Sequence, residues 1–342
     1  MSKNKKILSV ICIALILVSC FSFSASALVF NDGDFGYEMN SYTKEMALVE
    51  YKGSESNVII PSTYGNYPVT RIKKSALSGN STIQNVNFPL SMRKVDDGAL
   101  SFCKSLTSIH FPSYISNLGN ETCLNCTGLL SAQVNAETDK LPDYTFTGCS
   151  SLKEVSLGSS IKTIGSFAFQ NCISLENANF ISQVNSIERF AFDSSGITKL
   201  TVPEGVEEIP EYCFSNCSEL EFVSIHKNVT SIDSTAFVND PKLVLGVYFD
   251  SYAYHYAKDN NIAYKLLDEF MLGNVDSEEV VNINDATAIQ RNLAELEEFN
   301  ELQLLAADAN CDKVVDISDA TAIQMYCAGF VMPTPIGKII TQ

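Results

Sequence analysis

The stretch IKTIGSFAFQNCISL, residues 161–175, decides the fold, because its spacing of apolar residues returns along most of the chain. Close copies are VNSIERFAFDSSGI (184–197), VEEIPEYCFSNCSEL (206–220) and VTSIDSTAFVNDPKL (229–243). The second Phe of the stretch belongs to a mostly aromatic column that consists of Leu77, Leu100, Cys123, Phe146, Phe169, Phe192, Phe214 and Phe237. Neighbouring members of this column lie 23 residues apart, except for one step of 22 residues.

A second apolar column keeps the same register, five residues before the aromatic one. It consists of Ile72, Val95, Leu118, Leu141, Ile164, Ile187, Ile209 and Ile232. A repeat in the low twenties is typical of a solenoid, in which each coil buries its apolar edge against its neighbours. Runs such as SLTSIHFP (105–112) and SLKEVSLG (151–158) alternate apolar and polar residues, which predicts one strand per coil. The predicted fold class is therefore a β-rich solenoid whose strands form one parallel sheet.

A third column, rich in cysteine, follows the aromatic one by three residues. Its members are Asn80, Cys103, Cys126, Cys149, Cys172, Ser195, Cys217 and Asp240. Side chains at one position of successive coils point the same way at about the strand spacing of ~4.8 Å, whereas the Cβ atoms of a disulfide converge to ~3.8 Å. We expect these cysteines, with Cys123 and Cys213, to be buried thiols that fill space in the core. Disulfides or metal binding are the alternatives to this interpretation.

The repeat resembles a known family of bacterial surface proteins, the BspA-like leucine-rich repeat proteins, whose unit reads IP..V..I...AF..C.SL. The lead-in ALVEYKGSESNVIIPSTYGNYPVTRI (47–72) is similar to the first coil of that family, and LGVYFDSYAYHYAKDNNIAY (245–264) is similar to its closing segment. The resemblance implies a leucine-rich repeat solenoid over residues 28–267. It also implies a short helix near residues 251–259 that caps the open end of the sheet.

The outward positions of the strands decide what the solenoid can do. By alternation they are Asn85, Asn87, Ser108, His110, Ser131, Gln133, Glu154, Ser156, Asn177, Asn179, Lys199, Thr201, Phe222 and Ser224. These residues are mostly small and polar, and they offer no acid–base pair and no nucleophile beside a histidine. The face therefore predicts binding of a protein or a glycan, and the alternative is a merely solvated surface. We interpret its one histidine, His110, as a solvated surface residue.

Two acidic stretches near the C-terminus share one pattern, NVDSEEVVNINDATAIQ (274–290) and DANCDKVVDISDATAIQ (308–324). Calcium takes six to eight oxygen ligands, and a twelve-residue loop can supply them from positions 1, 3, 5, 7, 9 and 12, with a backbone carbonyl at position 7. The candidate ligands are Asn274, Asp276, Glu278, Val280, Asn282 and Asp285 in the first loop and Asp308, Asn310, Asp312, Val314, Asp316 and Asp319 in the second. We predict two Ca²⁺ sites, and the alternative is an acidic helix pair without metal.

Each acidic loop leads into a DATAIQ segment that is predicted to be a helix. The apolar positions expected to face a core are Val281, Ile289 and Leu293 in the first unit and Val315, Ile323 and Cys327 in the second. Position 6 of such a loop is usually Gly, because its backbone is left-handed, yet Glu279 and Lys313 stand there. A non-glycine residue in that conformation costs about 1 kcal/mol. Because Glu278 is also longer than the usual Asp or Asn, we expect the second site to bind calcium more tightly.

The two loop–helix units, over residues 268–332, resemble a type I dockerin, the small all-α module that attaches cellulosome components to a cohesin on a scaffoldin. The match in VNINDATAIQR (281–291) and VDISDATAIQM (315–325) covers both loop and helix. The resemblance implies that the cohesin-facing residues are Ile283, Asn284, Gln290 and Arg291 in one copy and Ile317, Ser318, Gln324 and Met325 in the other. It also implies two similar binding faces related by a pseudo-twofold axis. Residues 333–342 are expected to form a tail.

The N-terminus has the order of a secretory signal peptide over residues 1–27: three lysines, an apolar run over 7–18, and Ala25-Ser26-Ala27. The protein is therefore expected to be secreted. In the alternative interpretation, Leu17-Val18-Ser19-Cys20 is a lipobox, and lipidation of Cys20 would tether the protein to the membrane. No other stretch approaches the ~18 apolar residues of a membrane helix.

The net charge of −17 argues against nucleic acid as a partner, because phosphate binding needs clustered Lys and Arg. Thirteen Asp or Glu residues fall between positions 269 and 330, against Arg291 and Lys313, so most of the imbalance lies in the C-terminal fifth. Carboxylates at this density repel one another unless a cation lies among them. The charge distribution therefore supports the calcium prediction.

These features predict a secreted, non-catalytic protein that docks onto a cohesin through calcium and presents a repeat surface for binding. A polysaccharide-degrading enzyme is the first alternative, because most dockerin-bearing proteins take part in polysaccharide catabolism. The sequence leaves no room for a catalytic domain between the solenoid and the acidic loops, and it lacks Trp, the usual sugar-stacking residue. A lipid-anchored surface adhesin is the second alternative.

Overall fold

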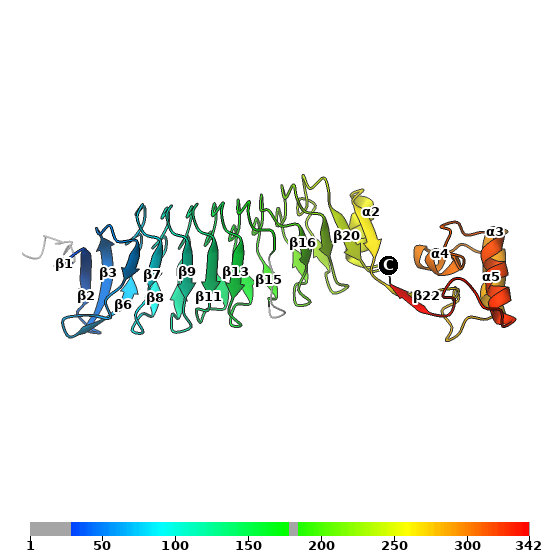
Figure 1. The fold of residues 1–342 in the computed structure, drawn as a ribbon, viewed down its shortest axis with the longest axis horizontal. Helices are drawn as coiled ribbons and strands as arrows, with labels where there is room; N and C mark the ends of the chain where they lie inside the picture. The colour runs from blue at the N-terminus through cyan, green and yellow to red at the C-terminus, as the bar shows by residue number, and fades with distance from the viewer. Residues whose placement is uncertain (1–28, 178–183, 342) are drawn as a thin grey trace, which may run out of the picture.

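Short parallel strands line one side of the coils in the computed structural model, which describes residues 29–177 and 184–341. They form three hydrogen-bonded groups, which together are called the long sheet. Ser131 pairs with Ser108 on one side and with Glu154 on the other, so the register advances by one repeat per strand. The strands of this long sheet are β4 (Asn57–Ile59), β7 (Asn85–Asn87), β9 (Ser108–Phe111), β11 (Ser131–Val134), β13 (Glu154–Leu157), β16 (Lys199–Thr201), β18 (Phe222–Ser224), β20 (Val244–Val247) and β21 (Ala263–Leu266). The coils stack along one axis (Figure 1). The predicted solenoid with parallel strands is confirmed.

A second set of parallel strands follows the isoleucine column of each coil. These strands are β6 (Tyr67–Ile72), β8 (Lys94–Val95), β10 (Asn117–Leu118), β12 (Lys140–Leu141), β14 (Thr163–Ile164), β15 (Ser186–Ile187), β17 (Glu208–Ile209) and β19 (Ser231–Ile232). The prediction of a single parallel sheet was therefore wrong. Most of these strands have only two residues, which is too short for the apolar–polar alternation by which a strand is recognised in sequence.

The core between the two sets of strands is built from the predicted columns. The rings of Phe146, Phe169, Phe192, Phe214 and Phe237 stack on one another, with centroids 5.1 to 5.7 Å apart. The cysteines of the third column are buried, free thiols, as are Cys123 and Cys213, which confirms the predicted role as core fillers. The alternative of disulfides does not hold for these seven residues, which are free thiols.

The cysteine side chains also make a polar contact that the sequence did not predict. The thiol of Cys126 donates a hydrogen bond to the backbone carbonyl of Leu100 in the preceding coil, at 3.1 Å. The same contact joins Cys103 to Leu77, Cys149 to Cys123, Cys172 to Phe146 and Cys217 to Phe192, at 3.1 or 3.2 Å. Burial raises the pKa of the Cys103 and Cys217 thiols to about 12. The thiols therefore act as neutral donors that connect successive coils.

Both ends of the solenoid are covered. At the N-terminal end the strands β1 (Val29–Asp32), β2 (Phe35–Asn40) and β3 (Glu45–Tyr51) form an antiparallel unit, which joins β6 through β3; β5 (Thr63–Tyr64) also pairs with β6. At the other end the helix α2 (Tyr252–Asp259) begins after Ser251, whose side chain accepts the N–H of Tyr254. The predicted capping helix is therefore confirmed.

The C-terminal residues form a separate helical unit beyond α2 (Figure 1). Its elements are β22 (Glu269–Met271), α3 (Ile283–Leu293), α4 (Glu301–Ala307), α5 (Ile317–Cys327) and β23 (Ile339–Thr341). Strand β23 pairs antiparallel with β22, and Ile336 is buried in the core of this unit, so the expected tail packs onto it. The sequence predicted neither this strand pair nor the helix α4.

The predicted apolar faces of α3 and α5 are correct only in part. Ile289 and Ile323 are fully buried, and Val281 and Val315 pack against the same core. The prediction for Leu293 and Cys327 was wrong, because both side chains are exposed. Each is the last residue of its helix, so its side chain lies at the end of the unit.

Candidate functional site

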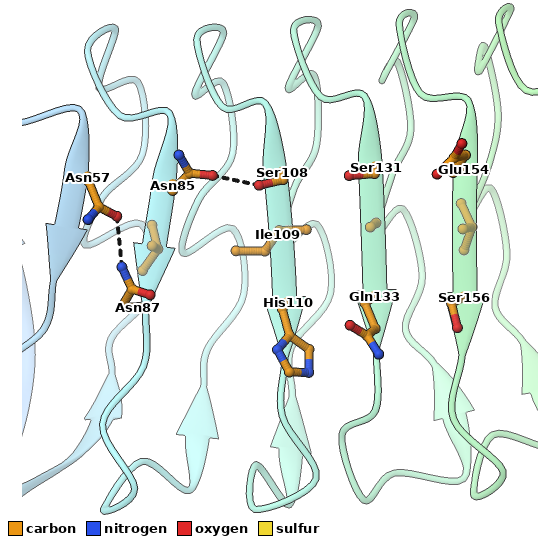
Figure 2. A pocket seen from close by; sticks show the side chains of 13 residues that line it. Asn57, Asn85, Asn87, Ser108, Ile109, His110, Ser131, Gln133, Glu154 and Ser156 are labelled. Carbon is orange, nitrogen blue, oxygen red and sulfur yellow. Dashed lines mark hydrogen bonds between the residues drawn. The ribbon is translucent and has the colours of Figure 1, made fainter.

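A groove of about 700 Å³ runs across the outer face of the long sheet, from β4 to β13. Two rows of side chains line it, one from the first and one from the third residue of each strand (Figure 2). The first row is Asn57, Asn85, Ser108, Ser131 and Glu154, and the second is Asn87, His110, Gln133 and Ser156. Val86, Ile109, Ala132 and Val155 lie between the rows and form the floor. Eight of the outward positions predicted from the sequence therefore meet in one groove, and Asn57 joins them.

The groove is almost uncharged, and its side chains both donate and accept hydrogen bonds. Asn87 donates to the Asn57 side chain at 2.7 Å, and Ser108 lies 2.5 Å from the Asn85 amide oxygen (Figure 2). His110 is exposed, and its Nε2 atom lies 3.4 Å from Asn135 Nδ2. Amide and hydroxyl groups can exchange these contacts for contacts with a ligand. The groove can therefore bind an uncharged polar ligand by hydrogen bonding.

The three histidines of the chain show no catalytic pairing in the described residues. His110 faces Asn135, and His226 contacts the carbonyl of Pro203. His255 lies 2.8 Å from Asp250 on the exposed side of α2. The part of the chain that the structure describes thus places no Ser or Cys nucleophile among the recorded hydrogen-bond partners of a histidine.

A second aromatic column runs along the surface, and the sequence analysis missed it. The rings of Tyr144, Phe167, Phe190 and Tyr212 stack with centroids 4.6 to 4.7 Å apart and planes within 17° of parallel. All four residues have a left-handed backbone, with φ from 52° to 60°. Their signal in the sequence is an aromatic residue two positions before Phe146, Phe169, Phe192 and Phe214 of the buried column. These half-buried rings stabilise the turns that border the coils.

The second acidic loop has the backbone that a calcium loop requires. Lys313 at position 6 is left-handed, with a φ of 72°, as the sequence predicts for that position. The Asp308 carboxylate accepts the N–H groups of Asp312 and Lys313, both at 3.0 Å. The Asp312 carboxylate accepts the N–H of Val314 at 2.9 Å. These bonds fold the loop around its own oxygen atoms.

The first acidic loop differs in conformation. Glu279 at position 6 does not share the left-handed backbone of Lys313. Asn274 at position 1 is buried, and its Oδ1 atom has no hydrogen-bond partner, while its Nδ2 atom donates to the carbonyl of Glu278. A buried oxygen without a partner fits a cation ligand, because such an atom otherwise costs free energy.

The two position-12 carboxylates are fully buried at the start of the helices. Asp285 accepts the N–H groups of Val275 and Asn282, and Asp319 accepts those of Asn310 and Asp316. Burial raises the pKa of both carboxyls, although these backbone bonds oppose the shift. Each carboxylate therefore closes its loop onto the following helix, where it completes a capping box.

The donor set of the loops fits calcium better than a transition metal. No group of three or more His, Cys, Asp or Glu side chains within residues 29–177 and 184–341 is placed to hold a metal by itself. The predicted loops also use amide oxygens, from Asn274, Asn282 and Asn310, and the carbonyls of Val280 and Val314. Neutral oxygen donors of this kind suit a hard cation.

The eight residues carried over from the dockerin resemblance are all exposed. Ile283 and Ile317 show 53% and 58% of their surface at the starts of α3 and α5, although both are apolar. Gln290 and Gln324 occupy equivalent positions in the two helices, as do Asn284 and Ser318. Met325 is exposed at the place of Arg291, which pairs with Glu297 at 3.3 Å. The two predicted cohesin-facing surfaces are therefore similar, and they differ in charge at the position of Arg291 and Met325.

The predictions for residues 1–27, the signal peptide and the lipidated Cys20, lie outside the described residues, as does Asn179. Within residues 29–177 and 184–341, no helix has the length and apolar character needed to cross a membrane.

Comparison with known protein families matches residues 51–139 and 139–245, more than half of the chain, to the BspA type leucine-rich repeat region, in six copies. No curated protein matches the chain.

Several solved structures are similar to part of the chain. A leucine-rich cell surface protein from Faecalibacterium prausnitzii is 21% identical over 66% of this chain and 77% of its own, with a TM-score of 0.45. A leucine-rich repeat protein from T. pallidum is 20% identical over 69% of this chain and 97% of its own, with a TM-score of 0.43. A leucine-rich repeat protein from Bacteroides ovatus is 19% identical over 70% of this chain and 76% of its own, also with a TM-score of 0.43.

Proposed function

Because the chain belongs to the BspA-type leucine-rich repeat family, we propose that it is an exported, non-catalytic binding protein whose ligand lies in the groove of the long sheet. We further propose that its C-terminal unit is a calcium-dependent dockerin that attaches the protein to a cohesin of a cellulosome-like scaffoldin. The groove carries the first proposal, and the two acidic loops carry the second.

The chemistry of the groove favours a glycan over a protein as the ligand. Its rows of amide and hydroxyl groups match sugar hydroxyls, which also both donate and accept hydrogen bonds. Protein interfaces usually depend on exposed Trp, Tyr or Arg at their centre, and the groove lining includes none of these. Glu154 is its one acidic residue, so a highly charged polymer is not favoured either.

An array of neutral glycans, acidic glycans and surface proteins tests this assignment. We expect the mature protein to retain neutral glycans, and we expect His110→Ala with Gln133→Ala to reduce retention at least tenfold. The matched control is Asn117→Ala with Glu208→Ala, two exposed residues on the second set of strands. Binding to the arrayed proteins but not to the glycans would show that the ligand is a protein. Binding to none of the arrayed molecules would contradict a binding function of the groove.

The docking proposal rests on the shared pattern of the two acidic loops and on the exposure of the eight predicted cohesin-facing residues. In that proposal Ca²⁺ would be held by the predicted ligands, with the second loop binding more tightly. Calcium would neutralise the carboxylates and fix the starts of α3 and α5. The exposed Ile283 and Ile317 would then present equivalent apolar contacts to a cohesin.

Cohesin capture from the culture supernatant, with and without a calcium chelator, tests the docking proposal. If the two faces are equivalent, Ile283→Ala with Asn284→Ala should keep most of the binding, and so should Ile317→Ala with Ser318→Ala. All four substitutions together should abolish capture. Capture that persists in chelator, or a chain that binds no calcium in calorimetry, would contradict the dockerin assignment.

A further inference from the structure

The helix α4 joins the C-terminal unit to the solenoid. Its first residue, Glu301, lies 2.8 Å from the Nζ atom of Lys258 in α2 and accepts a hydrogen bond from the Tyr264 hydroxyl at 2.6 Å. One turn later, Leu305 packs against the hydrophobic core of the solenoid. The contact therefore combines an ion pair, a hydrogen bond and an apolar side chain.

The partners of Glu301 are held in place within the solenoid cap. Lys258 also lies 3.0 Å from the hydroxyl of Tyr254 and 4.9 Å from the centre of its ring. The hydrogen bond to Glu301 raises the pKa of Lys258. Burial opposes ionisation of Glu301, but the bonds from Lys258 and Tyr264 outweigh it and lower the pKa of the carboxyl. Both charges are therefore present at neutral pH.

The other end of α4 belongs to the second acidic loop. Asp308, the first candidate calcium ligand of that loop, is the C-cap residue that directly follows α4. The helix also contacts the first loop and the residue before it, since Gln303 donates to the carbonyl of Val275 at 3.3 Å and Gly273 donates to the carbonyl of Ala306 at 2.8 Å. One short helix thus connects both loops to the cap of the solenoid.

We propose that α4 couples calcium binding to the seating of the C-terminal unit on the solenoid, an inference that rests on the proposed calcium sites. A helix of seven residues is not stable alone, because nucleation is costly, so α4 depends on contacts at its two ends. Asp308, at the C-terminal end of α4, would be held in place if it ligated calcium, and this would order that end of the helix. The ordered helix then presents Glu301 and Leu305 to the cap.

The short connection between the two units supports this coupling. Only Leu267 and Asp268 lie between β21 and β22. The N–H of Leu267 donates to the carbonyl of Val247 at 2.8 Å, and Asp268 accepts the N–H of Phe249 at 2.6 Å. The connection is thus hydrogen-bonded to the solenoid at both residues, which keeps the C-terminal unit close to the cap and α4 within reach of α2.

Hydrogen exchange of the full chain tests the coupling, measured over residues 252–266 with and without calcium, while calorimetry on the same samples measures calcium binding. We expect calcium to slow exchange in this segment at least fivefold, the lower end of ordinary coupling between sites. Glu301→Ala should abolish the slowing. If calcium strengthens the contact between α4 and the cap, the contact must strengthen calcium binding by the same factor, so Glu301→Ala should also weaken calcium binding.

The matched control is Glu298→Ala, an exposed carboxylate that precedes α4. The charge-exchanged pair Lys258→Glu with Glu301→Lys should restore part of the slowing, which a merely destabilised helix would not. Calcium binding without any change in exchange over 252–266 would overturn the coupling and leave the calcium sites standing. Failure of the wild-type chain to bind calcium would overturn both proposals.

Discussion

The Oδ1 atom of Asp240 accepts a hydrogen bond from the backbone N–H of Cys217 at 2.7 Å, while its Oδ2 atom is buried with no partner. Asp240 stands in the last coil at the place where five of the seven earlier coils have cysteine. Burial, with the charge of Asp193 as a smaller cause, raises its pKa from 3.8 to about 7. Burial in the folded protein therefore favours the neutral, protonated form of the Asp240 carboxyl.

This pKa shift predicts how stability depends on pH. The unfolded chain releases the Asp240 proton near pH 3.8 and the folded chain only near pH 7, so the free energy of unfolding should fall as pH rises through this window. Asp240→Asn mimics the protonated form, so in this variant the free energy of unfolding should lose the pH dependence that comes from Asp240. Urea unfolding between pH 4 and 8 measures it, with the exposed Glu204→Gln as the control. An unchanged pH profile in Asp240→Asn would contradict the shifted pKa.

The buried thiols should be unreactive in the native protein. A thiol reagent should label Cys311 and Cys327, which are exposed, and leave the seven solenoid cysteines unlabelled until the chain is denatured. Burial raises the pKa of six of them, Cys103, Cys123, Cys149, Cys172, Cys213 and Cys217, and so suppresses the thiolate. Mass spectrometry of the labelled protein checks this expectation. Rapid labelling in a variant with Cys311→Ser and Cys327→Ser would contradict the buried column.

The surface aromatic column should contribute to stability. Phe190 stacks between Phe167 and Tyr212 at 4.6 and 4.7 Å, so Phe190→Ala should lower the free energy of unfolding by about 2 kcal/mol. Its φ of 56° strains an alanine but not a glycine, so Phe190→Gly should be the more stable of the two variants. Urea unfolding measures both. Phe102→Ala, at a left-handed residue outside the column, should cost less.

The two calcium loops should respond differently to glycine at position 6. Lys313 has a φ of 72°, so Lys313→Gly should relieve about 1 kcal/mol of strain and tighten calcium binding roughly fivefold. Glu279→Gly lacks this gain and adds flexibility, so it should leave binding at the first loop unchanged or weaker. Calorimetric titration of the full-length variants distinguishes the sites. Equal effects of the two substitutions would contradict the difference between the loops.

The repeat columns predicted most of the solenoid, because Phe169 and Ile164 mark the same positions in each coil and only stacking buries all of them. The second set of strands escaped prediction, because a pair such as Thr163–Ile164 is too short to show a period. The contact between Lys258 and Glu301 could not be predicted either. The two residues lie in units with separate hydrophobic cores, and the sequence pattern of one unit does not predict which residues of the other unit it contacts.

The sequence also predicted only part of the candidate site, because the repeat pattern does not extend to the irregular first coil. Alternation places His110 and Gln133 on the outer face, but it does not show that Asn57, from the irregular first coil, completes the groove. For the loops, residue types predicted the ligand positions. The difference between Glu279 and Lys313 depends on backbone conformation, which the sequence pattern of the two loops does not distinguish.

The ladder of thiols has a consequence for where this protein can fold. Each thiol of the ladder donates a hydrogen bond to a carbonyl of an earlier coil, and all nine cysteines within residues 29–177 and 184–341 are free. The solenoid therefore needs neither an oxidant nor a disulfide isomerase to reach its native state. It should fold equally well in a reducing cytoplasm and in an oxidising medium, so the redox state of the environment does not select where the active protein can be found or produced.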